Sequence, residues 1–145
     1  MRAAPVITLI AFAGCVDVHG GSVELAWELF SPSGSACCPN HDPCRAAGAQ
    51  LVRLHLHPVV CNAPEITPVR TFACNTTQGA TQFDIPPGTY CIDVDAAADP
   101  SSTAVANGPG PILRDVSNGN IVEIGAVALT VGDVTKCPGD QHLCQ

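Results

Sequence analysis

The chain has 145 residues and a formal net charge of −7, and its length is that of one domain with a single hydrophobic core. Hydrophobic residues make up 46% and charged residues 13%, which indicates a globular chain, while 13 glycines and 13 prolines favour many turns between short strands. The few basic residues are scattered, so the composition excludes the clustered positive charge that nucleic acids and anionic lipid surfaces require.

An apolar run over residues 3–13 is followed by a glycine and Cys15. The run is too short to cross a bilayer, since a spanning helix needs roughly 20 apolar residues, and the chain turns polar after the cysteine. Residues 12–15, Phe-Ala-Gly-Cys, resemble the lipobox of bacterial lipoproteins, in which the cysteine thiol receives diacylglycerol and the preceding signal is removed. The resemblance implies a signal peptide over 1–14 and a lipidated terminus with a short linker over 15–22.

Cys15 has two interpretations: a lipid attachment point, which we favour, or an ordinary thiol behind a secretory signal. Setting Cys15 aside leaves an even number of cysteines, which favours disulfides in an exported chain. These are Cys37, Cys38, Cys44, Cys61, Cys74, Cys91, Cys137 and Cys144. Val16 rather than aspartate follows Cys15, which resembles lipoproteins that are sent on to the outer membrane. We therefore expect a bacterial cell-envelope protein that is lipid-anchored at the outer membrane.

Alternation of apolar and polar residues predicts the first strands of the folded part. Residues 23–30 and 50–57 both have the period of a half-buried strand. The segment between them, residues 31–44, is rich in Pro, Gly, Ser and Cys and predicts a loop. Weaker patterns predict strands over 69–74 and 80–85.

The outward face of the 50–57 strand carries Arg53, His55 and His57, which we expect to face water. Two histidines at this spacing bind a metal only if a third ligand approaches, and the arginine on the same face would repel a cation. A solvated polar face is the favoured interpretation. The same interpretation applies to three carboxylates that lack the pattern of a calcium loop, namely Asp93, Asp95 and Asp99.

Residues 83–96, FDIPPGTYCIDVDA, combine a turn with a strand. Pro-Pro-Gly over 86–88 predicts a tight turn, and Tyr90 with alternate residues after it predicts a buried face. This stretch resembles the turn and strand of transthyretin-like, carboxypeptidase-regulatory and collagen-adhesin B-type modules. The resemblance implies a small β-sandwich, and it implies nothing about a ligand.

The last third of the chain predicts two more strands. Residues 97–111 are rich in Ala, Pro, Gly and Ser and predict an irregular excursion, while 112–116 and 121–131 flank a Gly-centred turn that favours a hairpin. Gly125 predicts a bulge or a bend in the final strand.

The pattern as a whole predicts an all-β fold: a single immunoglobulin-like or prealbumin-like β-sandwich of about seven strands, stapled by disulfides and preceded by the lipoprotein signal peptide. The sandwich domain covers 23–133, and a Cys-containing tail covers 134–145. Many disulfide connectivities are open. The pairs we expect are Cys44 with Cys74 and Cys137 with Cys144.

The cysteine-rich loop raises the possibility of a metal centre. Thiolates and imidazoles are ligands for copper and zinc, and the candidates are Cys37, Cys38, His41 and Cys44. Disulfides are favoured because the expected compartment is oxidising and the spacing lacks the paired ligands of a zinc ribbon.

The sequence carries no recognisable catalytic motif, such as a nucleophile elbow, a phosphate-binding loop or a metalloprotease helix. We therefore expect no catalytic residues and no cofactor, and a non-catalytic binding or structural module that meets the membrane through Cys15 and has an envelope protein as a further partner to consider. Two alternatives stay open. One is a periplasmic copper or zinc carrier that uses the cysteine-rich loop, and the other is an enzyme whose site is assembled from distant loops.

Overall fold

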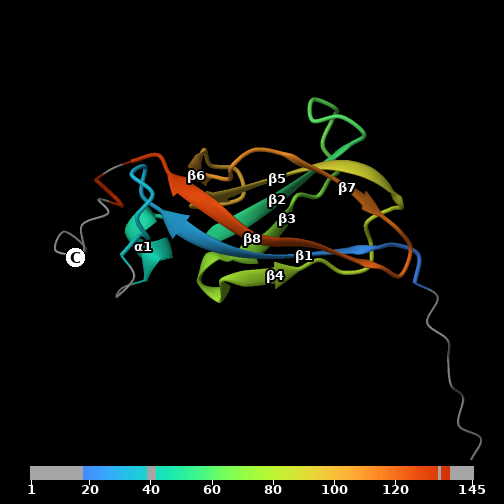
Figure 1. Ribbon diagram of the computed structural model, residues 1–145, viewed down its shortest axis with the longest axis horizontal. Helices are drawn as coiled ribbons and strands as arrows, with labels where there is room; N and C mark the ends of the chain where they lie inside the picture. The colour runs from blue at the N-terminus through green and yellow to red at the C-terminus, as the bar shows by residue number, and fades with distance from the viewer. Residues whose placement is uncertain (1–17, 39–41, 134, 138–145) are drawn as a thin grey trace, which may run out of the picture.

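Strands dominate the computed structural model, which describes residues 18–38, 42–133 and 135–137 and confirms the all-β class (Figure 1). The strands are β1 (Ser22–Phe30), β2 (Leu51–Pro58), β3 (Arg70–Ala73), β4 (Gln78–Ala80), β5 (Gly88–Ala97), β6 (Ala104–Asn107), β7 (Ile112–Val116) and β8 (Ile121–Val131). The helices are α1 (Pro43–Ala47) and the 3-10 turn η1 (Cys74–Thr76). Within the described ranges, no helix has the length and apolar character needed to cross a bilayer.

All eight strands belong to one hydrogen-bonded sheet in the order β3-β2-β5-β6-β8-β1-β4, with β7 paired to β5. The pair β1–β8 is parallel, and every other pair is antiparallel. The sheet is curled so that its two end strands, β3 and β4, come together. Phe72 of β3 lies against Gly79 of β4, where an added Cβ would stand 2.4 Å from the ring. The sequence predicts a sandwich of about seven strands, whereas the structure has eight strands in one sheet that is close to a barrel.

The inner face of the curled sheet forms the core from alternate residues of its longest strands. Trp27 of β1 and Tyr90 of β5 are both buried, and Tyr90 lies on the face that the sequence predicts to be buried. The Trp27 indole Nε1 donates to the Cys74 carbonyl oxygen at 2.8 Å, and its ring centroid lies 5.9 Å from that of Phe72. The Tyr90 hydroxyl donates to the Pro86 carbonyl oxygen at 2.8 Å and so closes the Pro-Pro-Gly turn. Both aromatic side chains therefore satisfy their polar atoms within the core.

Helix α1 begins at the end of the predicted loop over 31–44 and continues to Ala47, in a stretch for which the sequence predicts no element. Asp42 caps its start, because its Oδ1 accepts hydrogen bonds from the backbone N–H groups of Cys44 and Arg45 at 3.0 and 3.2 Å. Gly48 ends the helix with a left-handed φ of 75°. A helix of one turn leaves no periodic pattern in the sequence, so the capping residues are its main signal.

Three other predictions about the strands are wrong. The predicted strand over 80–85 is mostly irregular, since β4 ends at Ala80 and only Ile85 makes an isolated bridge with Gly21. The predicted irregular excursion contains β6, a strand of four residues. The predicted hairpin does not form, because β7 pairs with β5 while β8 pairs with β6 and β1. A short turn signal shows that the chain reverses, but it does not show which neighbours the two strands take.

The bulge at Gly125 is confirmed. Glu24 of β1 is opposite Glu123 of β8, and the next residue, Leu25, is opposite Gly125, so β8 contains one extra residue. Gly125 has a φ of 84°, a conformation that a residue without a Cβ adopts at little cost.

Candidate functional site

Three disulfides have both partners among the described residues: Cys37–Cys137, Cys44–Cys74 and Cys61–Cys91. The expected Cys44–Cys74 bridge is thus confirmed. Cys38 is also disulfide-bonded, while Cys15, His41 and Cys144 lie outside the described residues.

The expected Cys137–Cys144 pair is wrong, because Cys137 is bonded to Cys37. The reason is the parallel pairing of β1 with β8. Cys37 follows β1 and Cys137 follows β8, so the segments after these two strands leave the sheet at the same end. Sequence separation favoured a local loop, whereas the topology brings together residues that are 100 positions apart.

These bridges bear directly on the metal interpretation of the cysteine-rich loop. Cys37, Cys38 and Cys44 are all disulfide-bonded and therefore offer no thiolate to a metal ion. In the part of the chain that the structure describes, no three side chains of His, Cys, Asp or Glu converge as a ligand set.

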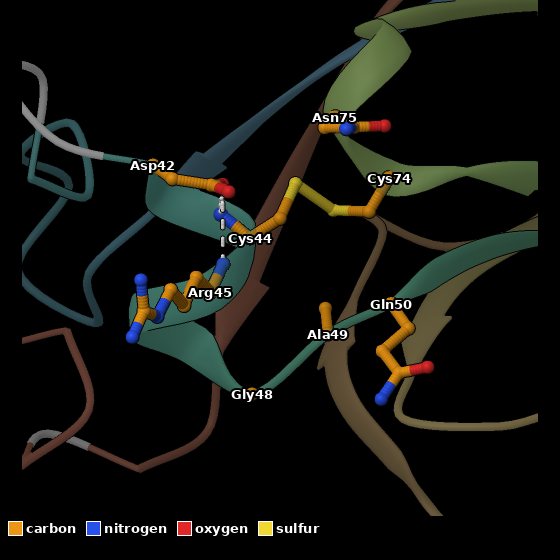
Figure 2. Close-up of a pocket in the computed structure, with 8 residues that line it drawn as sticks. All are labelled: Asp42, Cys44, Arg45, Gly48, Ala49, Gln50, Cys74 and Asn75. Carbon is orange, nitrogen blue, oxygen red and sulfur yellow. Dashed lines mark hydrogen bonds between the residues drawn. A yellow bond between two sulfur atoms is a disulfide. The ribbon is translucent and has the colours of Figure 1, made fainter.

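A surface hollow of about 410 Å³ lies beside the Cys44–Cys74 bridge (Figure 2). Helix α1 forms one wall, and residues 48–50, which lead into β2, form the other with η1. Its lining residues are Asp42, Cys44, Arg45, Gly48, Ala49, Gln50, Cys74 and Asn75. The two sulfur atoms are bonded to each other, so the polar groups around the hollow suit hydrogen bonding to a ligand and supply no thiol nucleophile.

A cluster of charged side chains lies on the outward face of β2 and β5, and its centre is Arg53. Arg53 Nε and Nη2 donate to the two carboxylate oxygens of Asp95 at 2.6 and 2.7 Å. Arg53 Nη1 donates to the carbonyl oxygens of Pro100 and Ser102 at 3.2 and 2.9 Å. Arg53 is only 8% exposed, so the expectation that it faces water is wrong, as is the expectation of a solvated Asp95. The alternation places Arg53 on the correct face, but loops cover that face.

His55 lies between two carboxylates of this cluster. Its Nδ1 is 2.6 Å from Glu65 Oε1, and its Nε2 is 3.3 Å from Asp95 Oδ2, an ion-pair distance without the alignment of a hydrogen bond. Contact with Asp95 is the largest influence on His55 and, together with Glu65, raises its pKa against the opposing effect of burial. Burial works to raise the pKa of Asp95, but His55 and Arg53 outweigh it, and the pKa of Asp95 is lowered.

The cluster joins two loops to the sheet. Glu65 belongs to the segment between β2 and β3. Two further contacts attach this segment to the sheet: the Cys61–Cys91 bridge, and a 2.8 Å contact between His57 Nδ1 and the Ala63 carbonyl oxygen. Pro100 and Ser102 belong to the turn between β5 and β6. His55 has a carboxylate at each ring nitrogen and does not line the hollow beside α1, so its contacts support a structural role.

The raised pKa of His55 predicts a specific pH dependence of stability. The ordinary pKa of histidine is 6.5. The imidazolium of His55 therefore stabilises the folded state fully below pH 6.5, and this stabilisation is lost as the pH rises through the raised pKa of the folded state. We expect the free energy of unfolding, measured in urea across this interval, to decline less steeply in His55→Gln than in the wild-type protein. The control His57→Gln keeps the His55–Asp95 contact and should retain the full decline. Equal slopes in His55→Gln and wild type would contradict the assignment.

The charged cluster is the part of the outward face that sequence reasoning missed. A signal exists in the register, because Arg53 and Asp95 are directly opposite each other on neighbouring strands. Using it requires knowledge that β2 pairs with β5, and alternation alone does not supply that knowledge.

The comparisons with known proteins give no further identification: no protein family model matches this chain, and no curated protein is similar to it. Its function is therefore inferred from its own residues.

Proposed function

We propose that this chain is a bacterial lipoprotein of the cell envelope, anchored through a lipid on Cys15 at the outer membrane, whose curled sheet acts as a non-catalytic binding or structural module. The observation that carries the proposal is the oxidation of the cysteines to disulfides. Cys37, Cys38, Cys44, Cys61, Cys74, Cys91 and Cys137 are all disulfide-bonded. Bridges in this number are typical of an oxidising compartment outside the cytoplasm.

The position of Cys15 supports a lipid anchor rather than a further bridge. It ends an apolar run, and residues 12–15 resemble a lipobox. One acyl chain gives only marginal membrane binding, whereas several chains, each stabilising by about 0.8 kcal/mol per buried methylene, hold a protein firmly. Only residues 16–21 separate Cys15 from β1, so the domain stays close to the lipid headgroups.

The chemistry of the described side chains supports a non-catalytic role. The cysteines of the loop are oxidised, and His55 is held by Glu65 and Asp95. The hollow beside α1 presents polar groups of Arg45, Gln50 and Asn75 and is the favoured place for a ligand.

The intact mass of protein extracted from membranes tests this proposal. We expect the mass of a chain that begins at Cys15, increased by a diacylglyceryl group and an amide-linked acyl chain, and reduced by two hydrogen atoms for each disulfide. Cys15→Ser should lose the acyl mass and leave the membrane fraction. The paired control Cys61→Ala with Cys91→Ala removes a bridge and should stay in the membrane. A wild-type protein without acyl mass would overturn the proposed function.

A further inference from the structure

The segment that leads from the anchor into the sheet is fixed between two turns. Gly21 exchanges backbone hydrogen bonds with Ile85 at 2.9 and 3.2 Å. On the other side, Ser22 N–H donates to the Asn120 carbonyl oxygen and Gly119 N–H donates to the Gly20 carbonyl oxygen, both at 2.9 Å. Figure 1 shows the start of β1 at one end of the molecule, beside the turn that precedes β8.

This end of the molecule presents apolar side chains to solvent. Val18 is 38% exposed, Phe83 is 40% exposed and Ile121 is 50% exposed. All three flank the same short segment: the Phe83 carbonyl oxygen would lie 2.8 Å from a Cβ at Gly20, and Ile121 is the register partner of Ser22. We call Val18, Phe83 and Ile121 the anchor-side patch.

The length of chain between the patch and Cys15 limits what can cover it. Only Val16 and Asp17 lie between Cys15 and Val18, and three extended residue steps reach at most about 11 Å. Building on the proposed lipid anchor, we propose that the anchor-side patch is a membrane-contact surface, which rests on a zwitterionic phospholipid bilayer and fixes the orientation of the domain.

The charge around the patch supports a zwitterionic rather than an anionic surface. Asp84, next to Phe83, is neutralised by Arg70, whose Nη2 lies 2.8 Å from Asp84 Oδ2. The chain carries a formal net charge of −7, so anionic headgroups would repel the domain. Apolar side chains at the level of the headgroups are therefore the attractive element.

Tryptophan reporters in the lipidated protein test the membrane contact. The chain has one tryptophan, the buried Trp27, so Phe83→Trp and Ile121→Trp add emission from the patch. The matched control is Thr130→Trp, on the same strand as Ile121 but about 30 Å away along it. Each membrane-extracted protein is reconstituted in phosphatidylcholine vesicles that contain a nitroxide-labelled phosphatidylcholine, and circular dichroism verifies its fold. We expect the fractional quenching of the patch reporters to exceed that of the control by about twofold or more.

A second variant separates apolar contact from simple tethering. Adding Phe83→Ser to Ile121→Trp should reduce the quenching by about half, whereas adding Ala128→Ser, at an exposed position seven residues further along β8, should not change it. Equal quenching of patch and control reporters in acylated protein overturns the membrane-contact surface and leaves the anchor in place, as does quenching unaffected by Phe83→Ser. An intact mass without acyl chains on the same samples overturns the proposed function, and this inference falls with it.

Discussion

Replacing Cys37 and Cys137 together by alanine is expected to lower the free energy of unfolding by about 4 to 5 kcal/mol. The bridge joins residues 100 positions apart. In the chain-entropy description, closing a loop of this length removes about 4.7 kcal/mol of conformational freedom from the unfolded chain. A single domain has about 5 to 15 kcal/mol of stability in total, so the variant should be marginally folded at room temperature. Equilibrium unfolding in urea measures the loss.

The Cys44–Cys74 bridge provides a matched control for this prediction. Its two cysteines are also buried, so the alanine pair removes a comparable packing volume, but it closes a loop of only 30 positions. The same description gives a loss of about 3.7 kcal/mol, which is about 1 kcal/mol less than for the longer loop. A loss for Cys44→Ala with Cys74→Ala as large as that for the Cys37–Cys137 pair would contradict the explanation from loop length.

Asp95→Ala is expected to destabilise the protein by about 3 kcal/mol, the largest effect expected of a single substitution. The change leaves the guanidinium of Arg53 on the covered face with two carbonyl acceptors but without the carboxylate to which it is hydrogen-bonded. Removing one partner of a buried ion pair typically costs about 3 to 5 kcal/mol, and the lower end applies because the Asp95 side chain is 16% exposed. The loss of the Asp95 contact should also lower the pKa of His55, because that contact is the largest cause of the raised value.

A double variant distinguishes the broken pair from lost packing. Arg53→Met combined with Asp95→Leu replaces both charges by apolar groups, and such replacements are often close to neutral. We therefore expect the double variant to be more stable than Asp95→Ala by about 2 kcal/mol or more in urea unfolding. If the double variant is as unstable as the single one, the ion pair is not the cause.

The strands with the clearest alternation could be predicted from sequence, and the reason is burial. β1 and β2 place alternate apolar residues in the core, and the Pro-Pro-Gly turn before β5 closes as its residues predict. Strand β6 could not be predicted, because its four residues lie within a Gly- and Pro-rich segment. The pairing of the strands could not be predicted either, since the signal for a turn before β8 does not reveal that β8 lies beside β1.

The candidate site was less predictable than the fold, because its residues depend on what covers them. Alternation assigns Arg53 and His55 to the outward face, and it cannot show that Glu65 and the turn at 100–102 lie over them. The cysteines illustrate the same limit. Their number and parity predict disulfides. The Cys44–Cys74 bridge joins the segment before β2 to the residue after β3, two strands that are neighbours in sequence, whereas Cys37–Cys137 depends on the pairing of β1 with β8.

The parallel contact between β1 and β8 also governs when the molecule is able to fold. Ser22 pairs with Ile121 and Phe30 with Thr130, so β1 completes its pairing only when β8 is present. Contacts between residues this far apart in sequence make folding slow, because loop closure precedes any gain from pairing. A chain that emerges amino terminus first has β4, the antiparallel neighbour of β1, early but lacks β8 until nearly all of residues 18–137 are available. A chain truncated before β8 would therefore have an incomplete sheet, with one side of β1 unpaired and prone to aggregation.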